Sequence, residues 1–294
     1  MVQARFIADR LKQRYKDLNF QIAPIRTKGD RMQNISLVEI GGKGIFVKEI
    51  EEALLSGKID MAVHSMKDVP VELPDELEIA AIPAREDHRD VLISRDRRKL
   101  EELPAGARIG TGSLRRRMQI LNLLPDVEIV PIRGNLDTRI RKIESEGLDG
   151  IILAAAGMRR MGRVAEVSQF IPDEVMLPAA GQGVLGIEIR KDDEEAREVV
   201  TFLNHRQTLF EISAERAFLA CLGGGCQVPI AGFARMDKEF MTLKGMVGSA
   251  DGRVIIAESA GGDYREWEEL GKKVAGNILE RGGRNLLEIE CGNC

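Results

Sequence analysis

The chain has 294 residues and a nearly balanced charge, with 43 Lys and Arg against 47 Asp and Glu. This length allows two or three domains of about 100–150 residues each. The balanced charge and the 4% aromatic content exclude a basic protein that coats nucleic acid and the stacking platforms of single-strand binders. No apolar run approaches the roughly 20 residues of a membrane helix, and the charged N-terminus does not resemble a secretory signal. We therefore expect a cytoplasmic protein without a membrane partner.

The first two-thirds of the sequence alternate between helix-like and strand-like segments. Apolar residues at three- to four-residue steps predict a helix over 2–18, and a second helix over 47–56 stops at Gly57. Short apolar runs bounded by polar turns predict the strands. The strands are expected at 20–25, 59–64, 77–82, 91–94, 107–110, 127–132, 149–154 and 184–189, with helices at 113–124 and 135–146. This alternation is typical of α/β lobes.

Two short segments divide these elements into lobes. The charged stretch 84–90 has no periodicity and suits a hinge, and the segment 178–186 leads the chain back to the first sheet. We therefore expect two lobes that form a clamshell around a cleft. After residue 205, a helix, three strand-like runs and a last helix predict an α+β domain. The expected domains are 1–83 with 184–203, 89–178, and 205–294.

The first predicted helix has no strand before it. An α/β lobe normally begins with a strand, because a helix needs a sheet on which to bury its apolar face, here Phe6, Ile7 and Leu11. Met1 also provides no capping side chain. We therefore expect that the first lobe lacks its N-terminal strand in this sequence. An upstream extension of about 15–20 residues would supply a strand and its loop.

Three groups of arginines follow three predicted strands of the second lobe, at 108–117, 132–139 and 157–160. Ligands of open α/β sheets bind at the carboxyl ends of the strands. Free N–H groups at a helix start, hydroxyl groups and adjacent guanidinium groups together bind anions. One group alone is typical of a solvated helix face, but three at one edge favour a polyanion or polycarboxylate. The residues are Thr111, Ser113, Arg115, Arg116, Arg133, Arg139 and Arg160.

A further group of polar residues lies in the segment 63–70, where a predicted strand leads into a turn fixed by Pro70. The turn carries Lys67 and Asp68, a base and an acid that could reach the cleft from the first lobe. An ordinary surface ion pair is the alternative interpretation of these two residues. His64 and Ser65 are neighbours in the predicted strand and cannot both face one site, which excludes a catalytic triad built on them.

The four cysteines form two pairs near the C-terminus, Cys221 with Cys226 and Cys291 with Cys294. Four thiolates could bind zinc, but the first spacing is loose and a chain end frays, so we expect no metal and dispensable terminal cysteines. Cys226 follows three glycines. Such a loop can present a thiol to a cleft for covalent chemistry, and a small buried hydrophobic residue is the alternative.

The sequence resembles the porphobilinogen deaminase (hydroxymethylbilane synthase) family over nearly its whole length. The matching stretches are 38–49, 62–70, 110–116, 133–135, 177–183 and 224–229, in the order of the family. The resemblance implies a transferase of porphyrin, tetrapyrrole and heme biosynthesis that joins four porphobilinogen molecules head to tail and releases ammonia. The product is the linear hydroxymethylbilane. The family has two lobes of the periplasmic-binding-protein type and an α+β domain, in agreement with the elements predicted above.

The resemblance also implies roles for individual residues. One dipyrromethane primer per chain would be bound to Cys226 as a thioether, and Asp68 would be the catalytic residue that stabilises positive charge and transfers protons. Contacts with the primer are implied for Ser65, Lys67, Asp68, Thr111, Ser113, Arg115 and Arg116, and contacts with substrate for Arg133, Arg139, Arg160 and Gln182. The segment 28–44 would cover the cleft.

Two features depart from the family pattern. Gly112 replaces the middle hydroxyl residue of a Thr-Ser-Ser turn, and the strand and Arg/Ser loop that open the family's chains have no counterpart here. A catalytically impaired or truncated homologue therefore stays an alternative. A small-anion-binding clamshell protein is another, although such a binder has no use for a thiol at Cys226. We expect a monomer whose partner is the small molecule porphobilinogen, without nucleic acid.

Overall fold

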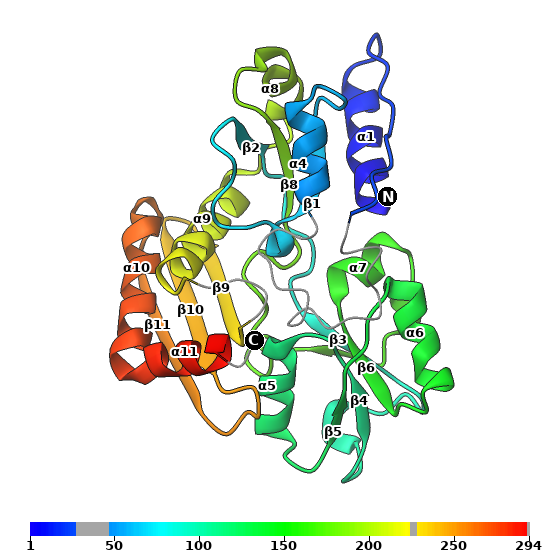
Figure 1. Ribbon diagram of the computed structural model, residues 1–294, viewed down its shortest axis with the longest axis vertical. Coiled ribbons are helices and arrows are strands. Elements are labelled where there is room, and N and C mark those ends of the chain that lie inside the picture. The colour runs from blue at the N-terminus through cyan, green and yellow to red at the C-terminus, as the bar shows by residue number, and fades with distance from the viewer. Residues whose placement is uncertain (28–46, 224–227, 293–294) are drawn as a thin grey trace.

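The computed structural model describes residues 1–27, 47–223 and 228–292, with side chains described up to residue 288. The described chain contains three separate sheets, each with its own helices (Figure 1). We call the part built on the β1-β8-β2 sheet the first lobe and the part built on the five-stranded sheet the second lobe. The part built on the β11-β10-β9 sheet is called the third domain.

The central strand of the first lobe comes from a distant part of the sequence. β1 (Ala62–Ser65) and β2 (Leu77–Ala81) both pair antiparallel with β8 (Leu185–Arg190). The helices are α1 (Val2–Arg14), α4 (Lys48–Leu55) and α8 (Glu194–Thr201). Ile7 and Leu11 of α1 pack with Ile187 on one face of the sheet, and Leu54 of α4 packs with Ala62 on the other face. The predicted return of the chain to the first sheet is confirmed.

The segment after α1 differs from the prediction. The structure shows no strand over 20–25, a segment in which Pro24 has no N–H to donate to a ladder. Phe20 instead packs against the core formed by α1 and β8. The helix itself ends at Arg14 rather than at residue 18, and Phe6, expected on its apolar face, is 45% exposed.

The second lobe has the strand order β5-β4-β6-β3-β7. The strands are β5 (Glu128–Val130), β4 (Arg108–Gly110), β6 (Gly150–Ala154), β3 (Asp90–Ser94) and β7 (Gln169–Ile171). β4 runs parallel to β5 and β6, and β3 is antiparallel to β6 and β7. The parallel strands lead into α5 (Leu114–Leu123), α6 (Leu136–Ser145) and α7 (Ala155–Arg160). Three helices therefore begin at one edge of the sheet; the sequence predicts α5 and α6, whereas α7 was not among the predicted helices.

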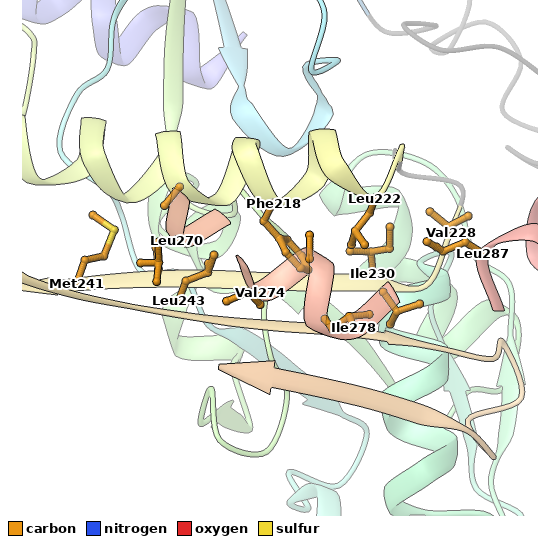
Figure 2. Packing of buried hydrophobic residues seen from close by; sticks show 14 of the residues in the cluster. Phe218, Leu222, Val228, Ile230, Met241, Leu243, Leu270, Val274, Ile278 and Leu287 are labelled. Atoms are coloured by element: carbon orange, nitrogen blue, oxygen red, sulfur yellow. The ribbon is translucent and has the colours of Figure 1, made fainter. Parts of the chain in front are cut away.

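The third domain is an antiparallel meander covered by helices. Its strands are β9 (Ile230–Asp237), β10 (Phe240–Gly248) and β11 (Ile255–Asp263), and its helices are α9 (Arg206–Cys221), α10 (Trp267–Ile278) and α11 (Arg284–Gly292). Figure 2 shows Phe218 of α9 pointing toward Val274 of α10, and Leu222 pointing toward Ile230 of the sheet. This core holds α9 firmly against β9 and β10, and the predicted α+β arrangement is confirmed.

Shorter turns complete the chain. They are the 3-10 turns η1 (Met66–Asp68), η2 (Leu100–Glu102), η3 (Val164–Glu166) and η4 (Tyr264–Glu266), and η5 (Leu279–Gly283), which joins α10 to α11. Residues 82–89, the first crossing, connect β2 to β3, and residues 172–184, the second crossing, connect β7 to β8. Among the described helices, none has the length and apolar character needed to cross a membrane.

Candidate functional site

A cavity of about 260 Å³ lies between the two lobes. The first lobe contributes Ser65, Lys67 and Asp68 to its lining, and the second lobe contributes Gly157 at the start of α7. Gly183 of the second crossing completes this side of the wall. Three residues that the sequence analysis assigned to the site therefore line one cavity, and they face it from the end of β1 and from η1.

The turn that carries Asp68 is held in place by the second crossing. Met66 is buried, and its N–H donates to the carbonyl of Val184 over 3.0 Å. Gly181 of the second crossing has φ +77°, and a Cβ there would lie only 2.8 Å from the backbone nitrogen of Lys67. The close approach of these two backbones fixes the turn. Asp68 is left exposed at the cavity while the residue two positions before it is held in the core.

Charged groups of the two lobes influence one another, although the described lining of the cavity contains none of the predicted arginines. Burial lowers the pKa of Lys67, and the nearby Asp68 opposes that change. Burial and the positive charge of Arg116 lower the pKa of Arg139 to about 10, again opposed by Asp68. The carboxylate of the first lobe therefore lies within electrostatic reach of the guanidinium groups of the second lobe.

At the start of α5, where the sequence predicts an anion site, side-chain hydroxyl groups of the turn accept hydrogen bonds from backbone N–H groups. Ser113 is the N-cap residue, and its Oγ accepts a hydrogen bond from the backbone N–H of Arg116. Oγ1 of Thr111 accepts another from the N–H of Ser113 over 3.2 Å. At Gly112 a Cβ would lie 2.6 Å from the carbonyl oxygen of Ile132. A serine in this turn would therefore require the neighbouring loop to shift, which gives the departure at this position a physical reason.

Asp90, a residue that the sequence analysis did not select, organises the arginines of this helix. Its side chain is fully buried at the start of β3. Its two oxygens lie 2.7 Å from Nη1 of Arg115 and 2.7 Å from Nη2 of Arg116, and Nε2 of Gln182 donates over 2.9 Å. Burial raises the pKa of Asp90, but the two guanidinium groups lower it further, so that it lies well below its usual range. These three predicted ligand residues thus have an internal acceptor.

The remaining predicted arginines lie at the same edge of the sheet. Nε of Arg139 donates to the carbonyl of Gly134 over 2.7 Å, and Nη2 of Arg160 donates to Gly183 over 2.8 Å. Burial lowers the pKa of Arg160, partly opposed by Glu86. Arg133 is half-buried, and its charge contributes to the lowered pKa of Arg139. The three arginine groups follow β4, β5 and β6, as predicted.

Glu188 is a second buried carboxylate that was not predicted from the sequence. Oε2 of Glu188 lies 2.9 Å from Nε2 of His64, and both side chains are buried in the first lobe. His64 lines the cavity, next to Ser65. The signal that could have revealed the pair is a single charged residue inside the apolar strand 184–189. No such signal marks Asp90, which lies in a hinge segment rich in charges.

Some predicted features lie outside the described residues. They are Cys226, Cys294 and the segment 28–44 that was expected to cover the cleft; the side chain of Cys291 is also not described. Cys221, at the end of α9, is an exposed free thiol. Across 1–27, 47–223 and 228–288, no three His, Cys, Asp or Glu side chains are placed to bind a metal ion together.

Comparison with known families gives two matches. Residues 1–198 match the family model "Porphobilinogen deaminase, dipyromethane cofactor binding domain", and residues 209–280 match "Porphobilinogen deaminase, C-terminal domain". Porphobilinogen deaminase of Syntrophus aciditrophicus is 54% identical over 98% of this chain and 94% of that protein. The Alkaliphilus metalliredigens protein of the same name is 47% identical over 98% of this chain and 91% of its own length.

Solved structures show a weaker likeness. The VFT2 domain of Bordetella pertussis BvgS covers 68% of this chain and 76% of that domain, with 13% identity and a TM-score of 0.39. An arginine-specific periplasmic binding protein of Salmonella typhimurium covers 54% of this chain and 70% of its own, with 17% identity and a TM-score of 0.34. The fold assignment given above follows from the strand order of this chain itself.

Proposed function

Since this chain belongs to the porphobilinogen deaminase family, we propose that Asp68 is the carboxylate on which its reaction depends. The enzyme joins four porphobilinogen molecules head to tail into hydroxymethylbilane, with loss of ammonia at each addition, for porphyrin biosynthesis. The observation that carries the proposal is the state of Asp68. It is exposed at the cavity between the lobes and, within the described part of the chain, forms no hydrogen bond or ion pair.

A carboxylate in this state suits the charge that the reaction creates. When ammonia leaves porphobilinogen, positive charge spreads from the methylene carbon into the pyrrole ring and onto its N–H group. A fixed negative charge close to that N–H stabilises the charge as it develops. The same carboxylate can accept the proton that is released when the new carbon–carbon bond has formed. We assign both tasks to Asp68.

The residues around the cavity fit the dipyrromethane cofactor of the family. When bound, this group supplies the nucleophilic pyrrole carbon to which the first substrate unit is joined. Pyrroles of this pathway carry acetate and propionate arms. Ser65 and Lys67 at the cavity, together with the hydroxyl and arginine residues at the start of α5, are a donor set suited to carboxylates. We propose that Cys226 holds the group by a thioether. The residues proposed to contact it are Ser65, Lys67, Asp68, Thr111, Ser113, Arg115 and Arg116.

Substrate and growing chain would contact the other arginines. We propose Arg133, Arg139 and Arg160, with Gln182, for this role. The support is their position at the carboxyl ends of the parallel strands, where ligands of such sheets bind. The contacts of Arg115, Arg116 and Gln182 with Asp90 mean that a ligand carboxylate would share these donors with an internal one.

Two substitutions at position 68 test the catalytic role. Asp68→Asn keeps the shape and removes the charge, so turnover should fall by about 10²- to 10³-fold, whereas Asp68→Glu, which keeps the charge, should lose less. Cofactor loading of each variant is measured by intact mass, so that turnover is compared per loaded molecule. Equal turnover of Asp68→Asn and the unchanged enzyme would contradict the proposal.

The attachment residue has a matched control in the same segment. The intact mass of the protein should exceed its sequence mass by one dipyrromethane unit. Cys226→Ser should remove this excess, and Cys221→Ser should retain it, because Cys221 ends α9 with its thiol exposed. If the excess mass were lost in Cys221→Ser and retained in Cys226→Ser, the thioether would be on Cys221, which would contradict the proposal.

We further propose that the enzyme is a cytoplasmic monomer with three domains, 1–83 with 184–203, 89–178, and 205–294. The separate hydrophobic cores of the first lobe, the second lobe and the third domain support these boundaries. Sedimentation of the loaded enzyme measures its oligomeric state, and limited proteolysis with sequencing of the fragments locates the boundaries. Fragments cut within a sheet rather than at a crossing would contradict the division.

A further inference from the structure

Helix α9 of the third domain has two buried faces. Phe218 and Leu222 face the core of the third domain (Figure 2). On another face, Ile212 packs in a cluster with Met66 and Val69, which lie on either side of the turn that carries Asp68. A helix that belongs to the third domain therefore also contacts the turn of the first lobe at which we place the chemistry.

Arg216 extends this contact by hydrogen bonds. It lies one helical turn after Ile212, on the same face of α9. Its Nη2 donates to the carbonyl of Pro70 over 2.7 Å and to that of Val71 over 2.8 Å, and its Nη1 lies 3.4 Å from the carbonyl of Val69. These are three successive carbonyls directly after Asp68. One guanidinium group thus fixes the chain where it leaves the turn.

Arg216 is not part of an ion pair within the described residues. Burial lowers the pKa of its guanidinium group, so placing the charge here carries a cost that the backbone carbonyls offset. A lysine has a single ammonium group and cannot span three successive carbonyls as a planar guanidinium does. The arrangement is therefore specific to arginine.

Glu215, the residue before Arg216, supports the turn that carries Asp68 through the second crossing. Oε2 of Glu215 accepts a hydrogen bond from the N–H of Gly181 over 2.6 Å. Gly181 is the residue that approaches the backbone of Lys67 closely. Adjacent side chains of α9 therefore fix both the second crossing, on which the turn rests, and the segment that follows the turn.

We propose that Arg216 is a positioning residue that holds Asp68 in place relative to the third domain. The inference rests on the proposed role of Asp68. Since α9 is packed in the core of the third domain, its contacts with residues 66–71 set the position of the carboxylate relative to that domain. Displacement of a reacting group by about 1 Å can cost up to a hundredfold in rate, so such a fixed connection has a direct effect on turnover.

Amide hydrogen exchange tests the positioning without any turnover. The N–H groups of Met66 and Val69 donate to Val184 and Met66 in the native turn. In Arg216→Met the peptide over 66–73 should exchange about tenfold faster, because its outer anchor is lost. The matched control is Arg206→Met, on the same helix, since Arg206 contacts Tyr264 within the third domain. Equal protection of this peptide in both variants would overturn the proposal.

A double-mutant cycle then tests whether Arg216 acts through Asp68. Arg216→Met should lower turnover per loaded molecule about tenfold, and Arg216→Lys should restore only part of it. In the Asp68→Asn background the same change should have little further effect, because the group being positioned is absent. Equal losses in both backgrounds would show that Arg216 acts independently of Asp68 and would overturn the inference.

The two proposals fail in different ways. Unchanged turnover of Asp68→Asn by itself would contradict the proposed function, and the catalytic part of this inference with it. Reduced turnover of Asp68→Asn together with unchanged turnover of Arg216→Met would contradict the inference alone. Intact mass of every variant excludes a difference in cofactor loading as the source of either result.

Discussion

Asp68 and Asp90 both lie near the guanidinium groups of the second lobe, but their surroundings are opposite. Asp90 is fully buried, and Arg115, Arg116 and Gln182 all donate to its oxygens. Asp68 is exposed on a turn at the cavity, and within the described residues its oxygens have no donor. The first carboxylate holds the protein together, and the second keeps its charge available for a ligand. The same residue type thus pairs with buried arginines in one region and faces an open cavity in the other, where we propose that it serves the chemistry.

The largest expected difference concerns stability. Asp90→Asn leaves two buried guanidinium groups without a compensating charge, so the free energy of unfolding should fall by about 3 kcal/mol or more. The same substitution at Asp68 removes an exposed charge and should change it by less than about 0.5 kcal/mol. Urea denaturation followed by circular dichroism measures both. Equal losses of stability in the two variants would remove the distinction between these carboxylates.

Acid should reveal the same contrast. The pKa of Asp90 is lower in the folded than in the unfolded protein, so its ionised form contributes stability that is complete above the unfolded value of about 4. This contribution is lost as the pH falls through the folded pKa. The difference in unfolding free energy between the unchanged protein and Asp90→Asn should therefore shrink between about pH 5 and pH 2. A constant difference over this range would contradict the assignment of the stabilising charge to Asp90.

The smallest expected effect lies in the first crossing. Burial raises the pKa of Asp87, but hydrogen bonds from Arg89 and Arg159 lower it to about 2. Both arginines are partly exposed, so solvent screens these pairs, and Asp87→Asn should cost only about 1 kcal/mol at neutral pH. This loss should disappear as the pH falls from about 4 to about 2, because the native carboxyl then becomes protonated. Thermal unfolding at the two ends of that range measures it.

The site was predictable from sequence where a residue follows a regular element. The three arginine groups follow short apolar strands. Because parallel strands place their carboxyl ends at one edge of a sheet, the common location of these groups could be predicted without knowing any distant contact. Asp90 could not be found in this way. It lies in a charged hinge, and its partners on α5 reach it only after the sheet has formed. Arg216 is similar, because its acceptors are backbone carbonyls of another lobe.

The fold was predictable to the same degree, and the prediction was wrong at individual elements for local reasons. Apolar runs gave most strands of the two lobes and the meander of the third domain. The run at 20–25 contains Pro24, which weakens any ladder, and its Phe20 packs against the core of the first lobe instead. β7 was not among the predicted strands. The apolar run 151–156 changes from strand to helix after Ala154, a boundary that hydrophobicity alone does not mark.

The origin of β8 has a consequence for the order of events during synthesis. β1 and β2 do not pair with each other, since both pair with β8, whose residues leave the ribosome more than a hundred positions later. The nascent N-terminal segment therefore waits with unpaired strand edges while the second lobe, whose strands all lie within one continuous stretch, can complete its sheet. Closing so long a loop is entropically costly and slow. The sheet whose strand β1 leads into the turn with Asp68 is therefore completed only after the strands of the second lobe have been synthesised.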